Sequence, residues 1–173
     1  MKDVILNAIE DTKLNVGPER SNKVILEYKN RNKEGGELVS SSDDIFVEAD
    51  RDRIMQVISN LLDNAIKFTC DGLVSVGFSR KIEKKEGPEK EDETVVVVSV
   101  QDTGSGIDPE IYPRLFTKFS SKSFSGTGLG LFISKSIIEA HGGKIWTQNN
   151  NAHRKSGATF SFSLPLALTP RSS

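Results

Sequence analysis

The sequence has very few of the residues that form disulfide bonds and metal centres. Its 173 residues include one cysteine, Cys70, and two histidines, His141 and His153. A single cysteine cannot form a disulfide within the chain, and it excludes a structural zinc site built on two or more cysteines. The cysteine count therefore suits a reducing compartment.

The sequence also lacks long apolar runs and an excess of charge of one sign. No stretch approaches the ~18 apolar residues of a membrane span, and the N-terminal residues mix charged and apolar side chains where a signal peptide would be apolar. Lysine and arginine number 23 against 24 aspartates and glutamates, which gives a net charge of -1. This balance argues against nucleic acid as a partner. We expect a cytoplasmic domain, whose parent protein could be anchored in a membrane.

What the chain does contain suffices for one globular domain with a core, since 36% of the residues are hydrophobic. The clearest element is a helix over 51–68, whose apolar residues fall on one face and which Asp50 would cap. The hydrophobic pattern predicts further helices over 2–14 and 129–141, and strands over 24–28, 45–49, 72–79, 95–100, 144–148 and 158–166.

Several details of this α/β arrangement follow from local signals. The strand at 45–49 is expected to form a hairpin with 24–28. Gly142-Gly143 predicts a left-handed helix stop. The helix over 129–141 is expected to turn one set of residues toward the core: Leu129, Phe132, Ile133, Ile137 and Ala140.

A charged segment, 81–93, separates two predicted strands, and ten of its thirteen residues are charged. We expect a hairpin loop there. It is either a solvated loop or a docking surface for a partner, and the solvated loop is the simpler interpretation.

Three groups of residues suggest chemistry. Asn60, Asn64 and Lys67 form a polar stripe beside the apolar face of helix 51–68, which is either a solvated face or a site for Mg²⁺ and phosphate. DTGSGI (102–107) follows a buried strand, where it is either a plain turn or a ligand loop in which Asp102 accepts a hydrogen bond from an amine. GTGLGL (126–131) opens a helix, where free N–H groups favour phosphate, although a Gly-rich turn without a ligand is also possible.

Together these groups resemble the ATP-binding catalytic domain of sensor histidine kinases, within the GHKL superfamily. The motifs, in chain order, are RIMQVISNLLDNAIKFT (53–69, N box), DTGSGI (102–107, G1 box), LFTKF (115–119, F box), GTGLGLFISKSIIEAHGG (126–143, G2 box) and GATFSFSLP (157–165). The resemblance covers about residues 2–166. It implies a two-layer α/β sandwich of the Bergerat type, with a mixed, mainly antiparallel sheet covered on one face by about three helices.

The resemblance also implies roles for single residues. Asn64 would coordinate a Mg²⁺ ion that bridges the ATP phosphates. Asn60 and Lys67 would be the catalytic residues and would act at the same phosphate site. Asp102 would bind the adenine amino group, with Thr159 nearby. Residues 108–125 would form the ATP lid, and 167–173 a tail. The remaining ATP-binding residues would be Phe68, Gly104, Gly106, Ile107, Lys122, Gly126, Thr127, Gly128, Leu129 and Gly130.

Two departures limit what the resemblance implies. The segment between Phe119 and Gly126 is short and lacks arginine, so Lys122 is only a candidate for the γ-phosphate. Neither histidine lies in a phosphoacceptor motif. We therefore expect Mg-ATP to donate its γ-phosphoryl group to a histidine on a separate dimerisation domain, most simply encoded upstream, with a response regulator downstream and the isolated domain monomeric. Alternatives are a degenerate nucleotide-binding regulatory module and a serine kinase of the anti-sigma-factor type.

Overall fold

The structure is a computed structural model that describes residues 1–15, 23–30, 46–84, 92–119, 128–150 and 157–166. The predicted tail, 167–173, and the lid residues 120–125 lie outside the described residues. The elements are α1 (Lys2–Asn15), β1 (Val24–Asn30), α3 (Arg51–Phe68), β2 (Gly72–Glu83), β3 (Glu93–Asp102), the 3-10 helix η1 (Tyr112–Arg114), α4 (Gly130–Ala140), β4 (Lys144–Asn149) and β5 (Ala158–Pro165).

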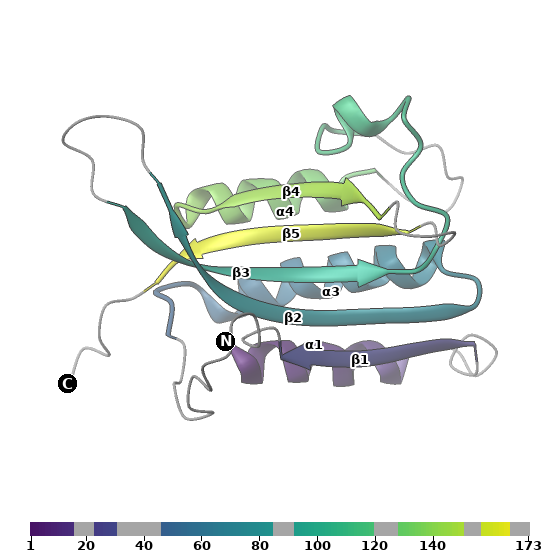
Figure 1. Cartoon of the computed structure of the whole chain (residues 1–173), viewed down its shortest axis with the longest axis horizontal. Coiled ribbons are helices and arrows are strands. Elements are labelled where there is room, and N and C mark those ends of the chain that lie inside the picture. The colour runs from purple at the N-terminus through teal and green to yellow at the C-terminus, as the bar shows by residue number, and fades with distance from the viewer. Residues whose placement is uncertain (16–22, 31–45, 85–91, 120–127, 151–156, 167–173) are drawn as a thin grey trace.

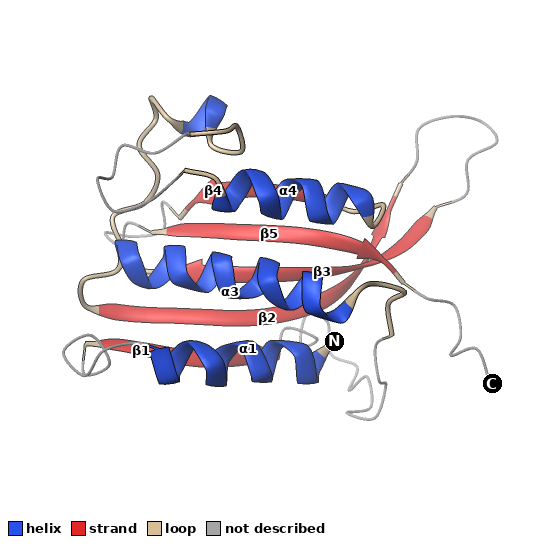
Figure 2. Cartoon of the chain, turned by 180° about the vertical axis from the view of Figure 1, so that it is seen from behind, coloured by secondary structure: helices blue, strands red, loops and turns tan. Residues whose placement is uncertain are grey.

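The five strands form one sheet in the order β1-β2-β3-β5-β4, and α1, α3 and α4 lie side by side over one of its faces (Figures 1 and 2). β1 pairs with β2 in parallel, and the other three pairs are antiparallel. The predicted two-layer fold, with a mixed, mainly antiparallel sheet and three helices on one face, is confirmed. Among the described residues, no helix is long and apolar enough to cross a membrane.

The core lies between the sheet and the helices, and strand alternation selects its residues. Val96, Val98 and Val100 of β3 point toward the helices, as do alternate residues of β5 from Ala158 to Leu164. α3 contributes the largest helical share, with Leu61 and Leu62 fully buried. Because side chains of a strand alternate between faces, this register places Asp102 on the same face as Val100.

The start of α3 and the end of α4 are joined directly. The Asp50 carboxylate accepts from the N–H groups of Asp52 and Arg53, so the predicted cap is confirmed. The backbone N–H of Asp50 in turn donates to Nε2 of His141, the residue that ends α4. The predicted glycine stop after α4 is also confirmed, since Gly142 has φ +73° and the N–H of Gly143 bonds to the Ile138 carbonyl.

The predicted hairpin between 24–28 and 45–49 is wrong. Residues 46–49, the described part of the second segment, form no strand. β1 instead pairs with β2, from Val24 opposite Gly72 to Asn30 opposite Phe78. The parallel ladder with β2 includes all seven residues of β1 and places Val24 in the core, a pairing with a strand distant in sequence.

The predicted inner face of α4 is also partly wrong. Ser134 and Ile138 are the buried residues, whereas Ile133 is 40% exposed and Ala140 is exposed. The physical reason is a polar contact: the Asn60 amide donates to the Ser134 hydroxyl at 2.9 Å, which turns a serine toward α3 where an apolar residue was expected.

The charged segment 81–93 does connect two antiparallel strands, but its ends belong to them. The ladder between β2 and β3 extends to Glu83 opposite Glu93. Lys144 of β4 adds an ion pair, in which Nζ lies 2.6 Å from a Glu83 oxygen. Residues 85–91 lie outside the described residues.

Candidate functional site

Asp102 ends β3 with its carboxylate buried, at 4% exposure. Oδ1 accepts from the N–H of Gly104 at 2.8 Å and from the N–H of Ala158 at 3.2 Å. Burial raises the pKa of Asp102, and the two backbone hydrogen bonds oppose that shift. Since both of these N–H groups meet Oδ1, the other oxygen is the one that the described residues leave to accept from a ligand amine.

The loop after Asp102 packs directly on the end of α3. The N–H of Ser105 donates to the Phe68 carbonyl at 3.3 Å, and a Cβ at Gly104 would collide with that same carbonyl. Glycine is therefore required at 104 by the close approach of two backbones. This contact brings the predicted G1 and N boxes together.

At its other end the loop is held by Asn149, the last residue of β4. Its Oδ1 accepts from the Ile107 N–H at 2.7 Å, and its Nδ2 donates to the Ile107 carbonyl at 3.0 Å. Ile107 is 8% exposed, and a Cβ at Gly106 would lie 3.2 Å from Asn149 Oδ1. The adenine side of the predicted site is thus enclosed by hydrogen-bonded backbone.

The polar stripe of α3 extends along the helix toward this loop. Asn60, Asn64 and Lys67 are all partly buried. Lys67 Nζ lies 5.6 Å from the centroid of the Phe68 ring, which is itself 49% exposed. The stripe therefore ends beside the loop that carries Asp102, at an exposed aromatic ring.

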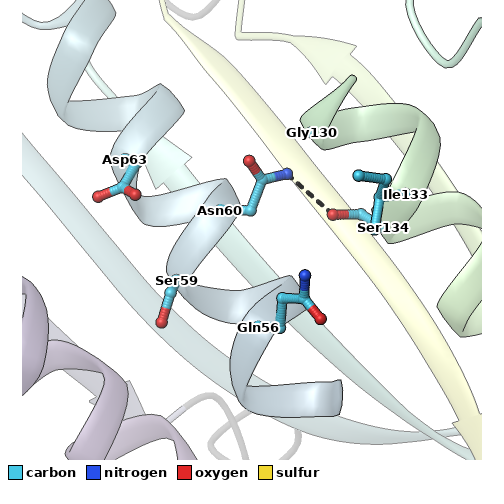
Figure 3. A pocket seen from close by; sticks show the side chains of 7 residues that line it. All are labelled: Gln56, Ser59, Asn60, Asp63, Gly130, Ile133 and Ser134. Carbon is cyan, nitrogen blue, oxygen red and sulfur yellow. Dashed lines mark hydrogen bonds between the residues drawn. The ribbon is translucent and has the colours of Figure 1, made fainter. Parts of the chain in front are cut away.

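A pocket of about 280 Å³ lies between α3 and α4. Figure 3 shows Asn60 pointing from α3 toward α4, where it bonds to Ser134 beneath Gly130. A Cβ at Gly130 would collide with the Asn60 amide, so any larger residue at the start of α4 would displace that side chain. Desolvation raises the pKa of Asp63, at the rim of this pocket. The residues that line it are Gln56, Ser59, Asn60, Asp63, Gly130, Ile133 and Ser134.

The structure does not bring Thr159 to the Asp102 carboxylate. Thr159 lies between Ala158 and Phe160, which face the helices, so its side chain points to the opposite face of the sheet. Its hydroxyl donates to Asn150 Oδ1 at 2.8 Å. The residue next to the carboxylate is Ala158. Of the other predicted ligands, Gly128, Leu129 and Gly130 lie at the start of α4, whereas Lys122, Gly126 and Thr127 lie outside the described residues.

Two residues of this region carried no signal in the sequence. Asn149 stands in a polar stretch of the sequence, and only its partner Ile107, distant in the chain, shows what it does. Tyr112 of η1 donates its hydroxyl to the Thr147 carbonyl at 2.5 Å, which ties the base of the predicted lid to the edge strand β4. No periodicity or motif could have indicated either contact.

The family model for histidine kinase-, DNA gyrase B- and HSP90-like ATPases matches residues 49–168. The chain belongs to this family. Among curated proteins, this ATPase domain is 39% identical over 148 residues to the phytochrome-like protein Cph1 of Synechocystis, covering 83% of the chain and 18% of Cph1. It is 35% identical over 128 residues to the sensor histidine kinase WalK of Bacillus subtilis, covering 70% of the chain and 19% of WalK. The domain spans less than a quarter of the length of these relatives.

Among solved structures, the domain matches the catalytic domain of histidine kinase ThkA with a TM-score of 0.68 and 30% identity, covering 95% of this chain and 91% of that one. It matches full-length ShkA in complex with AMPPNP with a TM-score of 0.66 and 27% identity, covering 94% of this chain and 30% of ShkA. This chain is therefore a catalytic ATPase domain of the sensor histidine kinase type, the class of domain that binds ATP in two-component signalling.

Proposed function

We propose that this domain binds Mg-ATP and donates the γ-phosphoryl group to a histidine on a separate dimerisation and phosphoacceptor domain. The observation that carries the proposal is the buried Asp102 carboxylate at the end of β3, held by two backbone N–H groups and facing α3. A buried carboxylate without a cationic partner among the described residues suits a neutral ligand that donates a hydrogen bond. The exocyclic amine of adenine is such a donor.

The phosphates would extend along α3 toward Gly130. Backbone N–H groups at the start of α4 and the partial positive charge of that helix end favour anions. Asn60 contacts the first turn of α4, and Lys67, about two turns further along the same stripe of α3, would contribute a cation. Both would act by positioning the phosphates and by electrostatic stabilisation, since phosphoryl transfer needs little covalent help from the protein.

The residues present fit a magnesium ion that arrives with ATP. Mg²⁺ prefers oxygen ligands and usually takes one or two from the protein and the rest from phosphates and water. Asn64, one turn after Asn60, would supply an amide oxygen to the ion. When bound, the ion would neutralise charge on the phosphates. Asn60 carries an amide, which cannot act as a general base that activates water for hydrolysis. This favours transfer over hydrolysis.

The test has a binding step and a transfer step. Calorimetry with AMPPNP should show binding that strengthens when Mg²⁺ is added. The domain is then incubated with γ-labelled ATP, alone and with the phosphoacceptor domain of a sensor kinase, and we expect acid-labile label on the added domain only. Label on this chain alone would contradict a separate acceptor, and acid-stable label would indicate a serine kinase. Binding without any transfer would indicate a regulatory nucleotide-binding module, whereas failure to bind AMPPNP would overturn the proposal.

The proposed partners follow from the same mechanism. They are ATP, the phosphoacceptor domain of the same parent protein or of its dimer mate, and a downstream response regulator that takes the phosphoryl group from the histidine. We propose that the isolated domain is monomeric, since dimerisation belongs to the phosphoacceptor domain. Light scattering on the purified domain checks this point.

A further inference from the structure

We propose that Asn149 is a positioning residue of the nucleotide site, which holds the loop after Asp102 in the shape that adenine needs. The inference rests on the proposed ATP binding, and it adds a residue outside every motif that suggested that function. Asn149 is the last residue of β4, and it precedes a polar segment that looks like an ordinary surface loop in the sequence.

The sheet register places Asn149 on the same side as the site. Asn149 lies opposite Ala158 in the β4–β5 ladder, and the N–H of Ala158 donates to the Asp102 carboxylate. Ile145, four residues before Asn149 on β4, packs against the core, so alternation puts Asn149 on the helix-covered face as well. Asp102, Ala158 and Asn149 therefore form a row across three strands at one end of the sheet.

The orientation of the Asn149 amide is fixed by its partners. A backbone N–H can only donate and a backbone carbonyl can only accept, so Oδ1 must face the Ile107 N–H and Nδ2 must face the Ile107 carbonyl. Both polar groups of one buried backbone unit are thus satisfied by a single side chain. Alanine at this position would leave both of them without this partner.

This pair of hydrogen bonds completes the anchoring of a short loop. Gly104 is held by Asp102, Ser105 by the Phe68 carbonyl, and Ile107 by Asn149. Gly106, between the last two, has φ +76°. With the Asn149 contact removed, the residues from Gly106 onward would have one anchor fewer beside the adenine pocket, and the loop would sample more conformations before the nucleotide binds.

The neighbouring residue offers a matched comparison. Gln148 is exposed and points to the opposite face of β4. A Q148E variant therefore makes the same change from amide to acid one residue away, with no contact to Ile107.

The experiment measures the dissociation constant of AMPPNP for N149D, N149A, Q148E and wild type between pH 5 and pH 8. An ionised carboxylate at 149 cannot donate to the Ile107 carbonyl, whereas a protonated one both donates and accepts. We expect N149D to bind about tenfold more weakly than wild type at pH 8 and to approach it as the pH falls. Asp102 and Asp108 are present in both proteins, so the ratio of the two constants removes their contribution.

The other variants separate positioning from general stability. N149A should bind more weakly by a ratio that does not change with pH, and Q148E should match wild type throughout. Amide exchange at Ile107 in the ligand-free protein should be faster in N149A and N149D. If wild type binds AMPPNP and both variants at 149 bind it equally well, or if the N149D ratio is independent of pH, this inference is overturned alone. If wild type does not bind, the proposed function fails with it.

Discussion

The two ends of the proposed nucleotide site are built differently. At the end of β3, the Asp102 carboxylate accepts from the N–H groups of Gly104 and Ala158, and Asn149 holds Ile107. Asp102 and Ile107 are both buried. Between α3 and α4 the site is an open pocket, with Ile133 40% exposed on its wall and Phe68 49% exposed beyond it. The adenine end is therefore preorganised, and the phosphate end depends on a helix start and a few side chains.

This difference suggests how the binding energy is divided. A preformed, buried carboxylate site selects a base by hydrogen bonding and strongly rejects ligands that lack the matching donor. A helix start binds any anion of suitable size, with weaker selectivity. We therefore expect changes at the adenine end to affect affinity most, and changes at the phosphate end to affect the preference for phosphate-bearing ligands.

The largest effect is expected from D102A. The variant removes the acceptor for adenine and leaves the N–H groups of Gly104 and Ala158 without their partner. Hydrogen bonds to charged groups contribute about 1.5–3 kcal/mol, so AMPPNP should bind about 10- to 150-fold more weakly. Calorimetry measures this, with Q148E as the control. Near-wild-type affinity of a folded D102A protein would place adenine elsewhere.

A smaller, selective effect is expected from G130A. The added methyl group displaces the Asn60 amide, whose bond to Ser134 is lost, while alanine favours the helix by up to about 1 kcal/mol. We expect AMPPNP to bind about fivefold more weakly and adenosine to bind as in wild type. Parallel titrations with the two ligands check this. An equal loss for both would contradict the separation of the two ends.

The smallest effect is on stability, in D102N. Because burial raises the pKa of Asp102 in the folded protein, the ionised form destabilises the fold. The wild-type protein is therefore most stable when the pH lies below the pKa that Asp102 has in the unfolded state. Its free energy of unfolding falls as the pH rises through the folded-state pKa. D102N, which keeps an oxygen for the two N–H groups, should melt a few degrees higher than wild type at pH 7.

The pH dependence supplies the control for that comparison. The difference in melting temperature should shrink as the pH falls through the raised pKa of Asp102, because protonated Asp102 is uncharged like the asparagine. A difference that is constant with pH would show that the asparagine acts by packing. AMPPNP affinity should fall in D102N even though the protein is more stable.

The parts of the molecule that local pattern determines were predictable from the sequence. The apolar periodicity of α3, its Asp50 cap and the glycine stop of α4 depend on neighbours within one or two turns. The alternation A-x-F-x-F-x-L in β5 also indicates that Ala158, and not Thr159, shares a face with Asp102.

The rest depends on partners distant in the chain. Nothing near β1 indicates that it pairs in parallel with β2, and nothing in α4 indicates that Ser134 faces Asn60. Asn149 has the same difficulty: an asparagine at a strand end has many possible partners, and only the three-dimensional fold selects Ile107.

The parallel pairing of β1 with β2 shows that the folded core includes residues outside the segment that the family model matches. The family match begins at residue 49, after α1 and β1, yet Ile5 and Ala8 of α1 are fully buried and Val24 of β1 is 7% exposed. α3 makes the crossing between the two parallel strands, and α1 packs against one side of it. A chain that began at residue 49 would lack α1 and β1, and it would leave that side of α3 in water.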